Sequence, residues 1–304
     1  MPAKTTPESL AKHLPPPLAR VAKRMVVYPR YWARVQACRR GFREFGDRYP
    51  QMVLFIAGLP KSGTSWLESM VASYPGFHDL LIPDVAAHEL TRGGSHDYEL
   101  PPDMFSRFQD MLVVTKMHVP GSPHNVRVLE SAGVRCVVLY RDLRDVAVSH
   151  IFYVRQTPWH PEFPVYARRS LEESLALFAE RNLLSFADWI RSWHDNADPK
   201  TTLIVRYEDM LADTCAVMTR VAGHFQLDDS HGTIASIADA HAFHRLSGGR
   251  PHGQLDTKSF FRKGVAGDWK SYFTPALHDL YTERIGRFLT EFGYEHDRYN
   301  PRQP

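Results

Sequence analysis

A lysine inside a glycine-containing loop is the first residue of this chain whose surroundings suit chemistry. Residues 52–57, MVLFIA, form a short apolar run that predicts a buried strand. The loop 58–63, GLPKSG, follows, and Thr64 and Ser65 then indicate the start of a helix. A strand, a glycine-containing loop and a helix together bind phosphate, because loop N–H groups and the helix N-terminus attract anions.

The position of this lysine, Lys61, departs from the P-loop of proteins that bind nucleoside triphosphates. In that loop, G-x-x-x-x-G-K-[ST], the lysine follows the second glycine and the next hydroxyl binds Mg²⁺. Gly58 and Gly63 keep the glycine spacing, but Thr64 stands at the lysine position. We therefore expect a phosphate-bearing donor that is used without an obligatory metal. The alternative is an ordinary turn between a strand and a helix.

A histidine at the end of the next predicted strand, residues 111–117, is the candidate for proton transfer. His118 precedes Pro120 and Gly121, and a neutral imidazole there can accept a proton from a substrate hydroxyl. Lys116 lies two residues earlier on the same strand face, which predicts a cation beside the base. Because the chain contains 16 histidines, a purely structural role is the alternative.

Arg141 and Ser149 lie in the segment YRDLRDVAVS, where a predicted strand passes into a predicted helix. A guanidinium group and a hydroxyl suit a phosphate group. Arg141 could instead pair with Asp142 or Asp145.

A second basic cluster, far along the chain, contains Arg262, Lys263 and Gly264. Two cations beside a glycine predict another phosphate-binding point, since glycine lets backbone N–H groups approach an anion. A solvent-exposed basic loop is the alternative. Trp66 and Phe243 are candidates for stacking on a purine base, with core packing as the default interpretation.

Strands and helices alternate along the chain, with strands predicted at 52–57, 111–117, 134–140 and 201–207. This alternation predicts a single α/β domain with a central parallel β-sheet flanked by helices, and the first loop makes it P-loop-like. Ligands of such sheets bind beyond the carboxyl ends of the strands. We therefore expect one crevice to contain Lys61, Lys116, His118, Arg141 and Tyr207.

The helices of this domain are predicted at 142–154, 171–193, 208–242 and 275–292. Three other segments, 75–108, 156–169 and 245–260, are predicted to be irregular and to wall an acceptor pocket. Trp159, Phe163 and Tyr166 in the second of these indicate an aromatic or apolar wall.

The N-terminal region, residues 1–46, is predicted to be a tail and a basic helical extension, followed by one domain at 47–296 and a tail at 297–304. Residues 18–46 mix basic and aromatic side chains and predict one or two helices broken near Pro29. Peripheral contact with an anionic membrane or an acidic partner is one interpretation. A packed helix with a solvent-exposed basic face is the other.

Composition narrows the class of protein further. The chain has 304 residues, is 43% hydrophobic, and can bury one large core or two small ones. A net charge of only +3 gives no case for nucleic acid binding. Three widely separated cysteines form neither a disulfide framework nor a metal-binding pattern. With no apolar stretch of about 20 residues and no secretory signal, we expect a cytoplasmic protein.

Taken together, these segments resemble the sulfotransferases that use 3′-phosphoadenosine 5′-phosphosulfate (PAPS), and most closely their cytosolic small-molecule branch. Four motifs match in order: PKSGTSW at 60–66, KMHVP at 116–120, YRDLRDVAVS at 140–149 and RKGVAGDWKSYFT at 262–274. A fifth and weaker match is VRYEDM at 205–210. The resemblance covers about residues 50 to 290 and implies the same parallel-sheet fold.

The resemblance also implies roles for individual residues. The loop around the 5′-phosphosulfate would contain Lys61, Ser62, Gly63, Thr64 and Ser65. His118 would be the catalytic base, with Lys116 as its partner at the sulfonate and Lys61 at the leaving phosphate oxygen. The 3′-phosphate would be held by Arg141 and Ser149 on one side and by Arg262, Lys263 and Gly264 on the other. The adenine would be contacted by Trp66, Tyr207 and Phe243.

The implied reaction moves a sulfonate from PAPS to a hydroxyl of a small molecule, a phenol, an alcohol or a lipid-like compound, and leaves adenosine 3′,5′-bisphosphate (PAP). The family's usual Thr-His-Leu-Pro reads Met117-His118-Val119-Pro120 here, which keeps the base. The dimer motif of the family is altered at Thr274-Pro275, so the oligomeric state stays open. The rival interpretations are a non-catalytic protein that binds nucleotides or anionic membranes, and a metal-dependent P-loop kinase.

Overall fold

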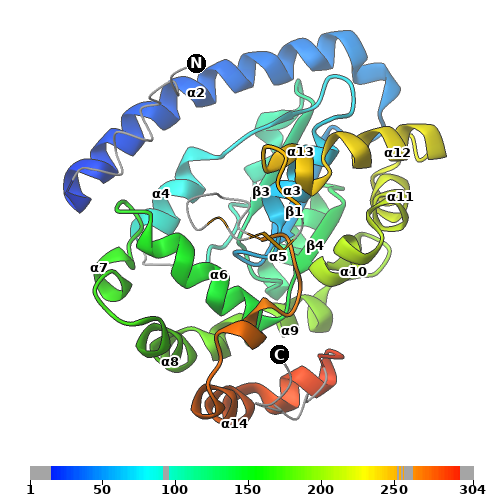
Figure 1. The fold of residues 1–304 in the computed structure, drawn as a ribbon. Coiled ribbons are helices and arrows are strands. Elements are labelled where there is room, and N and C mark those ends of the chain that lie inside the picture. Colours follow the sequence, from blue (N-terminus) through cyan, green and yellow to red (C-terminus); the bar gives the residue numbers. More distant parts are fainter. Residues whose placement is uncertain (1–14, 92–95, 252, 255, 257–262, 295–304) are drawn as a thin grey trace.

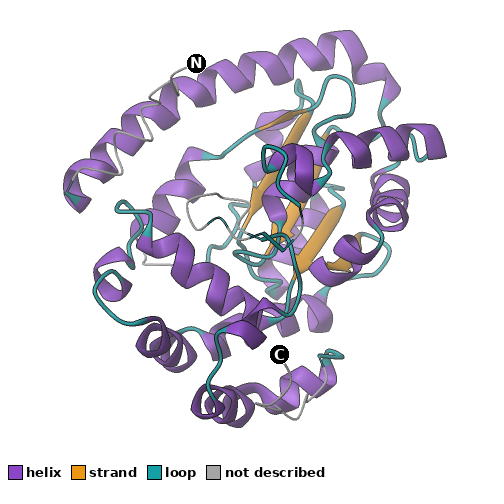
Figure 2. Cartoon of the chain, in the orientation of Figure 1, coloured by secondary structure: helices purple, strands orange, loops and turns teal. Residues whose placement is uncertain are grey.

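The computed structural model describes residues 15–91, 96–251, 253, 254, 256 and 263–294. Within these residues, five parallel strands form one sheet in the order β2-β3-β1-β4-β5. They are β1 (Val53–Gly58), β2 (His78–Asp79), β3 (Val113–Met117), β4 (Cys136–Tyr140) and β5 (Thr202–Arg206). The predicted parallel α/β sheet is confirmed, and Figure 2 shows its strands at the centre of a shell of helices.

Helices cover both faces of the sheet, which is why its central strands are apolar on both sides. In β1, Phe55 and Ala57 belong to one buried cluster, and Leu54 and Ile56 to another on the opposite face. The first cluster is completed by α6 (Leu143–Arg155), α8 (Leu171–Arg181), α9 (Leu183–Asn196) and α14 (Pro275–Glu291). The second is completed by α3 (Thr64–Val71), α10 (Tyr207–Ala212), α11 (Thr214–Phe225) and α12 (His231–Ala240).

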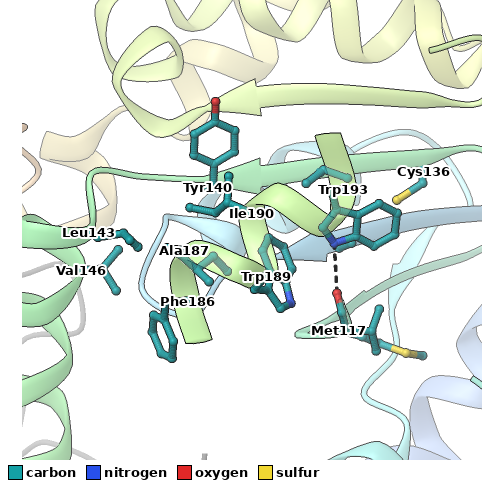
Figure 3. Packing of buried hydrophobic residues seen from close by; sticks show 14 of the residues in the cluster. Met117, Cys136, Tyr140, Leu143, Val146, Phe186, Ala187, Trp189, Ile190 and Trp193 are labelled. Atoms are coloured by element: carbon teal, nitrogen blue, oxygen red, sulfur yellow. Dashed lines mark hydrogen bonds between the residues drawn. The ribbon is translucent and has the colours of Figure 1, made fainter. Parts of the chain in front are cut away.

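Two tryptophans of α9 fix the chain just beyond β3. Trp193 Nε1 donates a hydrogen bond to the Val119 carbonyl at 3.1 Å, and Trp189 Nε1 donates to the His118 carbonyl at 3.3 Å. Both rings pack in the core with Tyr140 and Ile190 (Figure 3). The backbone that carries the predicted base is therefore held by buried contacts.

The segment predicted as one helix over 171–193 is two helices in the structure, α8 and α9. They meet at Asn182, whose Nδ2 donates to the buried carboxylate of Glu162 at 3.3 Å. The break at Asn182 goes with a tertiary contact to Glu162, and the hydrophobic periodicity of 171–193 does not indicate such a contact.

The predicted break near Pro29 was wrong, because α2 (Pro16–Phe45) runs through this proline without interruption. A proline inside a helix removes one backbone donor and crowds the carbonyl four residues earlier, yet this segment stays helical on both sides of Pro29. Figure 1 shows α2 as a long helix across one side of the molecule. The short segment η1 (Gly46–Arg48) then leads into the sheet.

The prediction that 75–108 and 156–169 are irregular was only partly right. The first contains β2, α4 (Pro83–Thr91) and η2 (Met104–Phe108), and the second contains α7 (Phe163–Tyr166). Tyr166 is fully buried in the core rather than exposed along a pocket wall. The remaining short elements are α5 (Pro123–Ser131), α13 (Phe243–Leu246) and η3 (Asp268–Ser271). In the described part of the chain, no helix combines the length and the apolarity needed to cross a bilayer.

Candidate functional site

The loop between β1 and α3 has the backbone of an anion-binding cradle. Gly63 adopts a left-handed conformation with φ +85° immediately before α3, and no side chain caps this helix start. Lys61 is also left-handed, with φ +64°. A Cβ atom on Gly58 would lie 1.9 Å from Thr64 Cγ2, so the helix can begin this close to the strand only above a glycine. Uncapped N–H groups at a helix start are an open site for an anion.

Side chains of the same loop fit a phosphate-bearing ligand. Ser62 is fully buried, and its Oγ has no hydrogen-bond partner among the described residues. An unpaired buried hydroxyl is unfavourable, so a ligand oxygen here would stabilise it. The Lys61 ammonium lies 4.1 Å from the centre of the Tyr153 ring on α6.

Lys116 lies against the start of α3 rather than exposed at the sheet edge. Its ammonium donates to Ser65 Oγ at 2.7 Å and to Glu68 Oε2 at 2.5 Å. Burial raises the pKa of Glu68, and the Lys116 ammonium opposes this rise. The predicted cation is therefore present beside the loop, but it is ion-paired with Glu68, a residue that sequence reasoning did not identify.

His118, the predicted base, contacts the first residue of the loop. Its Nδ1 lies 2.5 Å from the carbonyl oxygen of Gly58. Since a carbonyl oxygen only accepts hydrogen bonds, Nδ1 must carry the proton. In a neutral imidazole, Nε2 then holds the lone pair that can accept a proton. The strand register pairs Ala57 with Met117, so the next residues along the chain, Gly58 and His118, also lie side by side.

Arg141 is buried at the end of β4 and touches residues from three other parts of the chain. Its Nη2 donates to Asp145 Oδ2 at 3.0 Å and to the Val265 carbonyl at 2.7 Å. Its guanidinium carbon lies 4.3 Å from the centre of the Tyr207 ring. The open alternative for its partner is thus resolved in favour of Asp145, because Asp142 pairs with Arg144. The Nε of Arg141 is buried and has no partner in the described chain, which leaves a donor for an anion.

Asp145 joins Arg141 to the second basic cluster. It accepts hydrogen bonds from the backbone N–H of Gly267 at 2.7 Å and of Trp269 at 2.9 Å. Lys263 in this cluster pairs with Asp268 at 2.5 Å. The two predicted phosphate-binding points, 122 residues apart at Asp145 and Gly267, are therefore neighbours.

The aromatic residues predicted near adenine form two contacts. The Trp66 and Tyr207 rings meet edge to face with centres 6.3 Å apart, and Trp66 Nε1 donates to the His241 carbonyl. Phe243 lies so close to Gly264 that a Cβ there would be 2.4 Å from Phe243 Cδ2. Ser149 is half-buried on α6. Arg262 lies outside the described residues.

Two neighbours of the predicted site residues were not predicted from the sequence. Tyr153 lies beside Lys61, and His96 lies beside His118. Tyr153 is four residues beyond Ser149 on α6, so the helical period predicts that it lies on the same side of that helix. The His96 ring lies 5.6 Å from the His118 ring, and nothing in the local sequence indicates this contact. Among the described residues, no group of three or more histidine, cysteine or acidic side chains forms a metal site.

The fold and the site are those of an α/β protein with an anion-binding loop at the carboxyl ends of parallel strands. Residues 52–293 match the family model described as the sulfotransferase domain. This match covers most of the chain, so the protein belongs to the sulfotransferase family. The family predicted from the four motifs is confirmed.

Curated relatives agree with this membership. The chain is 26% identical over 257 residues to cytosolic sulfotransferase 1 of Arabidopsis thaliana, with 74% of this chain and 75% of that protein covered. It is 26% identical over 270 residues to flavonol 3-sulfotransferase of Flaveria bidentis, with 78% and 80% covered.

Solved structures show the same fold. Mouse sulfotransferase SULT7A1, complexed with PAP, matches with a TM-score of 0.58 and 21% identity over 82% of this chain and 92% of that chain. Retinol dehydratase, in complex with androsterone and inactive cofactor PAP, matches with a TM-score of 0.57 and 18% identity over 87% and 88%.

Proposed function

We propose that this sulfotransferase moves a sulfonate from PAPS to the hydroxyl of a small molecule, a phenol, an alcohol or a lipid-like compound, with His118 as the base. The observation that carries the proposal is the contact between His118 Nδ1 and the Gly58 carbonyl at 2.5 Å. This contact joins the proton acceptor directly to the first residue of the anion cradle. It also leaves Nε2 as the basic nitrogen.

The cradle and the two basic clusters would hold the donor. The 5′-phosphosulfate would bind at Lys61, Ser62, Gly63, Thr64 and Ser65, and the buried unpaired Ser62 Oγ supports this assignment. The 3′-phosphate would bind between Arg141 and Ser149 on one side and Arg262, Lys263 and Gly264 on the other. The unpaired buried Nε of Arg141 supports the first half of this clamp. The adenine would lie near Trp66, Tyr207 and Phe243.

PAPS supplies the sulfonate and a phosphate leaving group. His118 would accept the proton of the acceptor hydroxyl as its oxygen attacks sulfur in line with the leaving oxygen. Lys61 would neutralise charge at that leaving oxygen, and Lys116 would steady the sulfonate oxygens. Positioning and electrostatic stabilisation account for the rate in such a transfer, because the protein makes no covalent bond.

The acceptor class is supported by the surroundings of His118. Aromatic rings near this histidine include His96 and Phe186, whose centres are 5.2 Å apart. The name of one relative specifies a flavonol, a hydroxylated aromatic molecule. An aromatic surface with a few polar groups suits a flat hydroxylated acceptor.

Labelled PAPS, offered with a panel of phenols, alcohols and sterols in the presence and absence of EDTA, tests this proposal. We expect transfer to at least one hydroxyl acceptor, unaffected by EDTA. ATP hydrolysis that requires Mg²⁺ would favour the kinase alternative, and PAP binding without any transfer would favour a non-catalytic nucleotide-binding protein.

Membrane contact through residues 18–46 stays a prediction. Leu18, Val21 and Trp32 are exposed on α2 by 57%, 50% and 61%, which is the observation in its favour. Co-sedimentation with anionic and neutral vesicles would test it, and equal binding to both would contradict an electrostatic origin.

A further inference from the structure

His96 is a half-buried residue whose imidazole lies next to the predicted base. Its ring packs edge to face against two others, His118 at 5.6 Å and Phe186 at 5.2 Å between ring centres. Both of its ring nitrogens are buried, and neither has a hydrogen-bond partner among the described residues. Leaving a buried donor and a buried acceptor unpaired costs about 1–3 kcal/mol for each group.

The protonation state of His96 is set by its surroundings. Burial lowers the pKa of His96 well below its usual range, and the neighbouring imidazoles of His118, His150 and His160 lower it further. The ring is therefore neutral near pH 7, with one N–H donor and one nitrogen acceptor. A hydroxyl group can satisfy either nitrogen, because it both donates and accepts.

The backbone that follows His96 is held in place by contacts with two helices. Asp97 pairs with His88 of α4 at 3.1 Å. Asn125 of α5, which is fully buried, accepts from the Leu100 N–H at 2.8 Å and donates to the Tyr98 carbonyl at 3.0 Å. These contacts fix the segment immediately after His96 to two helices.

The neighbouring imidazole of His150 already has a hydrogen-bond partner. His150 Nε2 lies 2.7 Å from Glu162 Oε2, and Asn182 donates to the other oxygen of the same carboxylate. Both oxygens of the Glu162 carboxylate therefore have partners other than His96. Of these two imidazoles, His96 is the one whose ring nitrogens have hydrogen-bonding capacity left for a ligand.

We propose that His96 binds a second hydroxyl of the acceptor, on the carbon atom next to the one whose hydroxyl receives the sulfonate. The preferred acceptors would then be vicinal diols of the catechol type. This inference rests on the proposed function, because it takes His118 as the group that contacts the reacting hydroxyl.

The spacing of the two rings supports neighbouring hydroxyls. Each imidazole would hold its own oxygen at about 2.8 Å. Ring centres only 5.6 Å apart suit two oxygens on adjacent carbons. A carboxylate suits this site less well, since it can only accept and would place an unpaired charge in a buried region.

The experiment compares catechol with hydroquinone, which carry the same two hydroxyls and differ only in their spacing. We measure kcat/KM for both with labelled PAPS, in wild type, His96→Phe, His96→Gln and the exposed control His231→Phe. Wild type should prefer catechol by about tenfold, the value of one hydrogen bond. His96→Phe should abolish the preference, His96→Gln should keep part of it, and His231→Phe should leave it unchanged.

Three results would overturn the inference. These are equal kcat/KM for the two diols in wild type, an unchanged preference in His96→Phe, or no transfer to either diol. If wild type sulfonates hydroquinone or another panel acceptor without preferring catechol, the proposed function stands and only the role of His96 fails. Absence of transfer to every hydroxyl acceptor would instead contradict the proposed function itself.

Discussion

The two halves of the site that we propose bind the donor and the acceptor satisfy their polar groups in different ways. On the donor side, three cations are already paired with carboxylates: Lys116 with Glu68, Arg141 with Asp145 and Lys263 with Asp268. On the acceptor side, His96 is neutral and has no partner among the described residues. An unpaired buried charge costs more free energy than an unpaired neutral imidazole nitrogen. A charge therefore needs a permanent partner, whereas a neutral imidazole can stay unpaired until a ligand binds. On the proposed assignment, the half that would bind the constant donor is fixed by ion pairs, and the half that would bind the acceptor keeps hydrogen-bonding capacity for a ligand.

The largest effect should come from the residue where the two halves meet. His118→Ala should reduce kcat by about 10²–10⁴-fold, because it removes the proton acceptor, while PAP binding should change little. Steady-state kinetics and calorimetric titration of PAP measure the two quantities, with the exposed His231→Ala as the control. Near-wild-type turnover in His118→Ala would show that the base lies elsewhere.

The next largest effect should follow from loss of a permanent partner on the donor side. Asp145→Asn removes the counter-charge of buried Arg141 and weakens two hydrogen bonds to the backbone at Gly267 and Trp269. We expect the free energy of unfolding to fall by about 3 kcal/mol, and PAP to bind more weakly as the two basic clusters separate.

Urea unfolding and PAP titration test this substitution, and Asp279→Asn, at a carboxylate that is 87% exposed, is the matched control. Full PAP affinity in a destabilised Asp145→Asn protein would separate the stability role of this carboxylate from any role in positioning the clamp.

A smaller effect is expected from the cradle backbone. Gly63→Ala places a Cβ 2.7 Å from Tyr207 Cδ2 and forces alanine into the left-handed region at φ +85°. Gly133→Ala creates comparable backbone strain at φ +64°, but a Cβ there has nothing within 4 Å. Both should lose about 1–2 kcal/mol of stability. Only Gly63→Ala should also weaken PAP binding, and equal PAP affinity in the two variants would argue against the cradle.

The smallest effect concerns the acceptor half and depends on pH. The pKa of His96 is lower in the folded chain than in the unfolded chain, so the unfolded chain takes up the proton first as the pH falls below about 6.5. The stability present above that pH is therefore lost on acidification, by up to about 1.4 kcal/mol per pH unit for this residue. His96→Phe should show a shallower loss than wild type in urea unfolding at pH 7.5, 6.5 and 5.5. Parallel curves would mean that His96 does not titrate in this way.

Local sequence was enough to predict the backbone of the half that we propose binds the donor. The cradle, the strand-end positions of Lys116, His118 and Arg141, and the parallel sheet follow from apolar runs and glycine spacing over a few residues. Three predictions were wrong or only partly right. The division of 171–193 at Asn182 involves a distant contact, since Asn182 interacts with Glu162. The others are the unbroken helix through Pro29 and the regular elements within 75–108 and 156–169.

The sequence by itself determined the class of this protein, because the backbone of an anion cradle requires particular residues next to one another in the chain. The tertiary structure alone decided which carboxylate pairs with each cation and which imidazole is left unpaired beside His118. The three cation–carboxylate pairs join residues from 4 to 48 positions apart. Burial and distance, which no short segment specifies, determine their energies.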